Sequence, residues 1–138
     1  MIMLNEVRRT PSQPDHKEIS QDEAAAMARA TVNLFRRWEL SDGQARELLG
    51  GMAPRTWARW KKGDIGRIDR DLAMRMSILM GIHKGLRYLF SDPHRGYKWV
   101  KKPNSAFAGQ SALDVMLGGS IFNLARVRDY VDAERGGA

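Results

Sequence analysis

One short segment of the chain combines closely spaced cationic side chains with residue types that recognise phosphates and base edges. Residues 54–70 hold six Arg or Lys side chains and two carboxylates, in a chain whose formal net charge is +7. Arginine binds phosphates and guanine edges in a bidentate manner, and neutralising phosphates releases condensed counterions. The segment therefore predicts contact with DNA. The predicted DNA contacts are the polar side chains of its expected helix: Arg55, Thr56, Arg59, Lys61 and Lys62.

Two expected helices and a glycine-bearing turn position these side chains. Residues 41–44 fit a capping box that opens the first helix, and Gly50-Gly51 supplies a left-handed stop. Pro54 suits the first turn of the second helix. Trp57 and Trp60 lie three residues apart and are assigned to the core rather than to base stacking. This is the pattern of a DNA-binding helix-turn-helix, with a turn about one residue longer than the commonest compact form.

The remaining segments also favour helices. A capping box at Ser20 opens a helix, and Asp69 caps an apolar segment at 70–90 that Gly81 interrupts, which predicts two helices or one kinked helix. Residues 94–109 are aromatic, basic and irregular and predict an ordered loop, and two further helices are expected over 111–117 and 120–134. No segment alternates apolar and polar residues as a β-strand does. The expected fold class is all-α, with a helix-turn-helix N-terminal domain and a small, mainly helical C-terminal domain.

Composition shifts along the chain predict three parts. Residues 1–18 are polar and broken by prolines, and we expect a flexible arm. Residues 19–90 are expected to form the helix-turn-helix and dimerisation region. The turn at Ser91-Asp92-Pro93 then begins the second domain, residues 91–138.

Several function classes have no supporting residues. The chain has no cysteine and three scattered histidines, so we expect no disulfide, no metal site and no cofactor. The motifs of nucleophilic, acid–base and phosphate-loop chemistry are also missing, which predicts a protein that is not an enzyme. No run of about 18 apolar residues occurs, and the N-terminus does not look like a signal peptide. We expect a soluble cytoplasmic protein without a membrane partner.

The order of residues in both halves resembles the Xre/MbcA/ParS family of bacterial antitoxins over about residues 20–136. The resemblance is most specific in the second half, and the helix-turn-helix half is common to many repressors. The matching residues of the second half are Trp99, Pro103-Asn104, Phe107, Gly109, Ser111, Met116, Gly119, Val127-Arg128 and Tyr130-Val131-Asp132.

The resemblance implies two partners for the chain. In that family the helix-turn-helix binds the promoter of its own operon and dimerises, while the C-terminal domain covers a toxin. The usual toxin has a RES domain, an enzyme that degrades NAD. The implied assembly is a homodimer within a larger complex with operator DNA and a cognate RES-type toxin. The alternative hypothesis is a phage-type repressor whose second half serves only for dimerisation.

The last helix and the residues after it suggest how the toxin is covered. A toxin that binds a pyrophosphate must present cationic groups or N–H donors, and these groups also bind carboxylates. We expect the last helix and its glycine-rich tail to cover or enter that site, with Tyr130 and Arg135 as anchors, because Tyr and Arg dominate interface energetics. The candidate toxin contacts are Trp99, Asn104, Phe107, Arg128, Tyr130, Asp132, Glu134, Arg135, Gly136 and Gly137.

Overall fold

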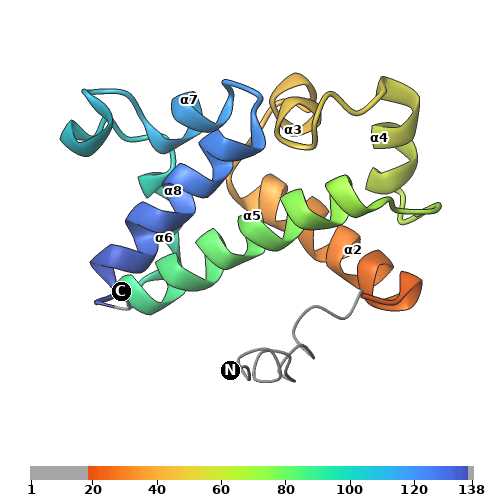
Figure 1. Ribbon diagram of the computed structural model, residues 1–138, viewed down its shortest axis with the longest axis horizontal. Coiled ribbons are helices and arrows are strands. Elements are labelled where there is room, and N and C mark those ends of the chain that lie inside the picture. The colour runs from red at the N-terminus through yellow and green to blue at the C-terminus, as the bar shows by residue number, and fades with distance from the viewer. Residues whose placement is uncertain (1–18, 137–138) are drawn as a thin grey trace, which may run out of the picture.

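The computed structural model describes residues 19–136, whose regular structure is helical apart from one isolated bridge between Pro103 and Ser111 (Figure 1). The expected all-α class is therefore confirmed for this range. The predicted flexible arm at 1–18 lies outside the described residues. The elements are α2 (Gln21–Arg37), α3 (Asp42–Leu48), α4 (Pro54–Lys61), α5 (Arg70–Leu89), α6 (Pro93–Trp99), the 3-10 helix η2 (Ser105–Phe107), α7 (Ala112–Met116) and α8 (Ile121–Glu134).

The helices begin where their capping residues predict. Ser20, Ser41 and Ser111 each form a complete capping box at the start of α2, α3 and α7. The carboxylate of Asp69 accepts a hydrogen bond from the backbone N–H of Leu72 at 2.8 Å and so caps α5. These bonds satisfy N–H groups that the first helical turn leaves without partners.

Helix α5 is one continuous helix of 20 residues that passes through Gly81 without ending. Gly81 and Gly85 lie one turn apart on the side that faces α8. A Cβ atom at Gly85 would overlap the Cγ1 atom of Val131, and one at Gly81 would overlap the guanidinium of Arg128. The glycines thus permit close packing of two helices. Of the two predicted alternatives, two helices or one kinked helix, the break into two helices is not observed, because residues 70–89 form one helix.

The expectation of a loop over residues 94–109 is wrong for two parts of that stretch. Pro93 opens α6, and the carboxylate of Asp92 accepts a bond from the N–H of His94 at 3.0 Å. Gly96 is buried where α6 meets Leu86 and Phe90, and a Cβ atom there would lie at ordinary contact distance, 3.5 Å from Leu86 Cβ. The 3-10 helix η2 follows, and the rest of the stretch is turn structure.

Helix α5 connects the two halves of the molecule. It packs against α2 on one side and against α6 and α8 on the other (Figure 1). Buried Arg75 adds a polar link, because its Nη2 atom donates to the backbone oxygen of Gly119 at 3.2 Å while its guanidinium lies against Gly50. None of the helices between residues 19 and 136 is both long and apolar enough to span a membrane.

Helix α4 packs on the aromatic core of the first half. Trp57 and Trp60 are 4% and 3% exposed, which confirms their assignment to the core. The ring of Phe35 lies 6.0 Å from that of Trp57 and 6.0 Å from that of Trp38. The side of α4 opposite these rings is therefore left to solvent.

The close packing of Gly85 against α8 predicts that alanine at this position destabilises the fold, which is the opposite of what helix propensity alone predicts. Replacing a helical glycine by alanine normally stabilises a helix by about 0.5–1 kcal/mol. Gly85→Ala instead forces the new methyl group against Val131, and we expect a net loss of about 1–3 kcal/mol in the free energy of unfolding, as found for overpacked cores. Urea denaturation followed by circular dichroism measures this loss.

Gly43→Ala is the matched control, because Gly43 lies in α3 and the nearest atom to an added Cβ is Ser41 Oγ at 3.9 Å. This variant should be at least as stable as the original chain. Equal stabilisation by both substitutions would contradict close packing at Gly85.

Candidate functional site

The outer face of α4 carries three of the five predicted DNA contacts. Arg55, Arg59 and Lys62 are exposed, and their spacing of four and three residues places them on one side of the helix. This side is opposite Trp57 and Trp60, which are buried. The structure therefore brings these three cations together on a surface that a polyanion can reach.

The turn between α3 and α4 is held by backbone bonds despite its length. Gly50 and Gly51 have φ angles of +84° and +86°, which L side chains rarely adopt. The N–H groups of Gly51 and Met52 donate to the carbonyl of Arg46 at 2.8 and 3.1 Å, and the Nε atom of Arg46 donates to the carbonyl of Met52 at 2.7 Å. The longer turn thus sets a fixed angle between the two helices.

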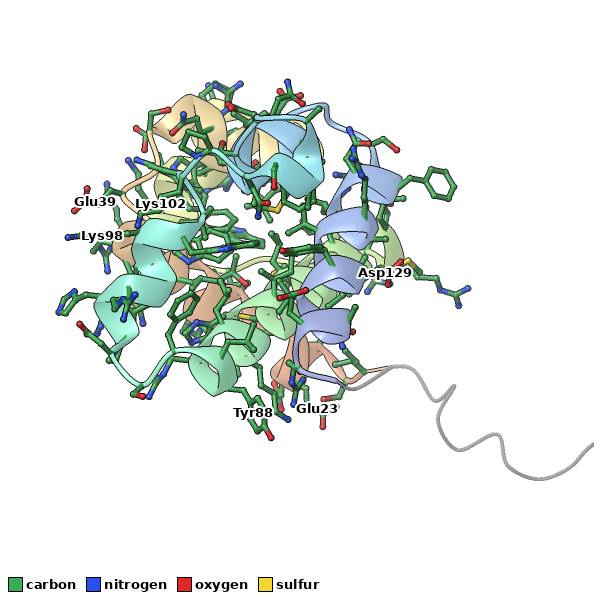
Figure 2. All side chains as sticks on the ribbon, turned by 90° about the vertical axis from the view of Figure 1, so that its left-hand side faces the viewer. Glu23, Glu39, Tyr88, Lys98, Lys102 and Asp129 are labelled. Atoms are coloured by element: carbon green, nitrogen blue, oxygen red, sulfur yellow. The ribbon has the colours of Figure 1, made fainter. Side chains whose placement is uncertain are left out.

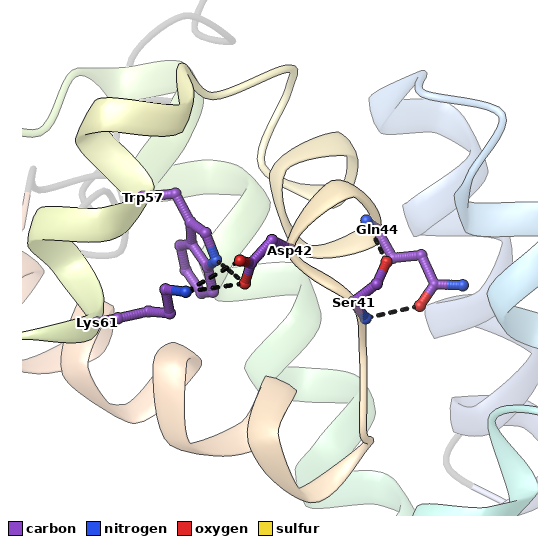
Figure 3. Close-up of polar contacts among 5 residues, drawn as sticks. All are labelled: Ser41, Asp42, Gln44, Trp57 and Lys61. Atoms are coloured by element: carbon purple, nitrogen blue, oxygen red, sulfur yellow. Dashed lines mark hydrogen bonds and ion pairs between the residues drawn. The ribbon is translucent and has the colours of Figure 1, made fainter.

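Asp42 joins α3 to α4 and redirects one of the predicted DNA contacts (Figure 3). Its carboxylate accepts a hydrogen bond from Trp57 Nε1 at 2.9 Å and lies 3.0 Å from the Nζ atom of Lys61. The bond from Trp57, and then the bond from Lys61, lower the pKa of Asp42 below its usual value. Lys61 is consequently turned toward α3, away from the outer face that Lys62 shares with Arg55.

A cavity of about 250 Å³ lies beside the outer face of α4. The half-buried Thr56 lines it together with Arg59 and Arg67. Arg67 belongs to the loop after α4 and was absent from the predicted contacts, although it lies within the basic run that pointed to DNA. The loop thus extends the cationic surface beyond the helix.

In the second half, three of the predicted toxin contacts form one aromatic cluster. The rings of Trp99 and Tyr130 stack at a centroid distance of 6.1 Å and an interplanar angle of 9°. Phe107 meets Trp99 at 6.5 Å and Tyr130 at 5.2 Å, both edge-on. Phe107 is only 2% exposed, so the outer surface of the cluster belongs to the half-buried Trp99 and Tyr130.

Asn104 shapes the loop that carries Phe107. Its side-chain oxygen accepts a bond from the N–H of Ala106 at 2.9 Å, and its carbonyl accepts bonds from Phe107 and Gly109, both at 2.9 Å. These bonds close the 3-10 turn of η2. The contacts of Asn104 thus position an aromatic ring.

Three other predicted contacts lie around an open cavity of about 430 Å³ at the ends of α5 and α8. Arg128 Nε donates to Asp132 Oδ2 at 3.1 Å, and Arg135 Nη1 lies 3.9 Å from Asp132 Oδ1. Tyr88 of α5 completes the lining, and the guanidinium of Arg135 lies 4.8 Å from the centre of its ring. Tyr88 is 70% exposed and projects from the end of α5 (Figure 2). Sequence reasoning missed it because Tyr88 precedes the second half.

The predicted toxin contacts therefore occupy two sides of α8. Arg128 and Tyr130 are two residues apart, which places them about 200° apart around a helix. One side faces the aromatic cluster and the other faces the cavity near Tyr88. Glu134 and Gly136 are exposed near the end of α8, and Gly137 lies outside the described residues.

Comparison with known proteins covers both halves of the chain. Residues 17–81 match the model of the antitoxin Xre-like helix-turn-helix domain, and residues 85–137 match that of the antitoxin Xre/MbcA/ParS C-terminal toxin-binding domain. The two matches meet within α5. A similar protein is the uncharacterized protein y4oB of Sinorhizobium fredii (strain NBRC 101917 / NGR234), which is 43% identical over 101 residues, or 73% of this chain and 78% of that protein.

The contacts of Asp42 predict a pH-dependent contribution to stability. Because the pKa of Asp42 is lowered in the folded chain, its contribution is present above the ordinary value of 3.8 and is lost as the pH falls through the lowered value. We expect Asp42→Asn to lower the melting temperature at pH 6, and the difference from the original chain to shrink toward pH 3. Thermal unfolding followed by circular dichroism at a series of pH values tests this.

Asp64→Asn serves as the control, since Asp64 is an exposed carboxylate in the loop after α4. Its effect on the melting temperature should be small at every pH. If the melting temperatures of Asp42→Asn and the original chain differ by the same amount from pH 6 to pH 3, the charged carboxylate of Asp42 does not stabilise the fold as assigned.

Proposed function

The chain belongs to the Xre/MbcA/ParS family of antitoxins, and from this premise we propose that its toxin is a RES-domain enzyme that degrades NAD. The antitoxin binds this toxin through its C-terminal domain and covers the active site. The helix-turn-helix binds the promoter of the shared operon and represses it. The functional unit is a homodimer within a larger complex of toxin and antitoxin.

One observation carries the proposed mode of neutralisation: the carboxylate of Asp132 is incompletely paired at the edge of an open cavity. Its Oδ1 atom is buried and forms no hydrogen bond within residues 19–136, because Arg135 Nη1 at 3.9 Å is too distant. A buried carboxylate oxygen without a donor costs free energy, so a partner gains affinity if its binding turns the Asp132 side chain and Oδ1 meets a donor. An enzyme that holds the pyrophosphate of NAD presents such donors.

Tyr88 and Arg135 supply the anchoring surface beside this carboxylate. The exposed ring of Tyr88 lies under the guanidinium of Arg135, so both side chains are oriented before the toxin arrives. Preorganised aromatic and Arg side chains are frequent hot spots of protein interfaces. The end of α8 therefore offers an anchor and a hydrogen-bond acceptor within one cavity.

The exposed face of α4 supports the proposed operator binding. Arg55 and Arg59 lie at its start and middle, where a recognition helix approaches the major groove. Thr56 and Arg67 lie beside them around the smaller cavity. The match of the second half to a toxin-binding domain favours the antitoxin over the alternative of a phage-type repressor with a C-terminal dimerisation domain.

Neighbouring lysines provide a matched test of the DNA surface. Lys62 is exposed on the outer face, whereas Lys61 pairs with Asp42. We expect Lys62→Gln to lower the slope of log affinity against log salt for promoter DNA by about 0.9, the effect of one lost phosphate contact. Lys61→Gln should leave the slope nearly unchanged. Fluorescence anisotropy with a promoter duplex at several salt concentrations measures both, and an equal change in the two variants would contradict the assigned orientation of α4.

Two aspartates of α8 provide a matched test of the toxin surface. Asp132 lines the cavity, and Asp129 is exposed at the edge of the molecule (Figure 2). We expect Asp132→Asn or Tyr88→Ala to raise the antitoxin concentration needed for half-inhibition of NAD hydrolysis by about 10- to 100-fold. Asp129→Asn should change it less than about twofold, because its exposed side chain forms no hydrogen bond or ion pair with the residues that the structure describes.

The toxin for this assay is the product of the reading frame next to the antitoxin gene. Thermal unfolding of each variant checks that the fold is retained. Full inhibition by both Asp132→Asn and Tyr88→Ala would place the inhibitory contact elsewhere, with the aromatic cluster of Trp99 and Tyr130 as the next surface to alter.

A further inference from the structure

A second cationic surface lies where the end of α2 meets α6 and the residues that follow α6. All of its members are exposed. We call it the α6 surface, and it consists of Arg36, Arg37, Arg87, Lys98, Lys101 and Lys102. Figure 2 shows Lys98 and Lys102 along one edge of the molecule, beside Glu39 and opposite Asp129.

Specific contacts hold this surface together. Arg37 Nη1 donates to the hydroxyl of Tyr97 at 3.3 Å, and its guanidinium lies 5.8 Å from the centre of that ring. The ring of His83 stacks on the same tyrosine at 6.3 Å. Lys101 Nζ donates to the backbone oxygen of Glu39 at 2.8 Å. The end of α2 is thereby fixed against α6.

The cations of this surface are not neutralised by the described part of the chain. Within residues 19–136, none of the six forms an ion pair, whereas Lys61, Arg75, Arg128 and Arg135 do. Burial, and then the charges of Arg87 and Arg37, lower the pKa of His83 below its usual value. Such a concentration of like charge favours an anionic partner.

The α6 surface is separate from the outer face of α4. Helix α4 packs against α2 and α3, while α6 packs against α5 (Figure 1). Gly96 of α6 meets Leu86 and Phe90 at the C-terminal end of α5, a helix of 20 residues that is about 30 Å long. One phosphate group therefore cannot touch both surfaces.

We propose that the α6 surface binds the phosphate backbone of duplex DNA without recognising its sequence, as a second DNA contact in addition to α4. A protein partner fits less well, because protein interfaces contain apolar anchors at their centre. The large apolar side chains that are exposed in the described part of the chain are Ile19, Met74, Tyr88, Leu89 and Phe122. Tyr88 and Leu89 follow Arg87 at the edge of the surface, and none of the five belongs to the end of α2 or to α6. This contact goes beyond operator recognition and does not depend on which toxin is bound.

The test uses the full chain with the α4 contact removed. Arg55→Ala/Arg59→Ala is the background, and the probe is a random-sequence duplex of about 30 base pairs followed by fluorescence anisotropy. We expect this background to retain salt-dependent binding. Adding Lys98→Gln/Lys102→Gln should lower the salt slope by about 1.8, or about 0.9 for each lost contact, and weaken binding at least tenfold at low salt.

Lys98→Arg/Lys102→Arg is the conservative control, because it retains both charges and should retain binding. Circular dichroism confirms the fold of every variant. Loss of all duplex binding in the Arg55→Ala/Arg59→Ala background would overturn the proposal, and so would an unchanged slope in Lys98→Gln/Lys102→Gln. Weaker toxin binding by the glutamine variant, with DNA binding unchanged, would also overturn it and assign the surface to an acidic protein. Failure of operator recognition is a separate result, seen as unchanged promoter affinity in Arg55→Ala/Arg59→Ala alone.

Discussion

The close approach of α5 and α8 is the constraint on which the second half of the structure depends. It requires a position without a Cβ atom at Gly85, because Val131 occupies the space that a side chain would need, while the flexible guanidinium of Arg128 lies over Gly81. Val131 becomes part of the core, and Arg128 is placed to pair with Asp132. The cavity at the end of α8 is therefore a product of helix packing as much as of the residues that line it.

Much of the fold was predictable from the sequence because its signals are local. A serine with a matching residue three positions later caps a helix wherever the chain is placed, and Ser41 and Ser111 do so here. Signals that depend on tertiary contacts were misinterpreted. Gly81 has the appearance of an interruption until α8 is packed against it, and the start of the 94–109 stretch has the appearance of a loop until α6 packs against α5.

The candidate sites show the same division. The shared face of Arg55, Arg59 and Lys62 follows from spacing along one helix. The inward turn of Lys61 does not, because it depends on Asp42 of another helix. Tyr88 joins the cavity from a helix that the sequence placed in the first half, so only the folded chain brings it to Arg135.

The continuity of α5 also affects how the two domains of such proteins can be recombined. The matches to the two domain families meet between residues 81 and 85, within one helix and between the two glycines that α8 packs against. A chimera that joined the DNA-binding half of one antitoxin to the toxin-binding half of another would place its junction inside a packed interface. We therefore expect recombination between family members to keep Gly81, Gly85 and α8 together, because exchanging residues 91–138 alone would set the α8 of one parent against the α5 of the other.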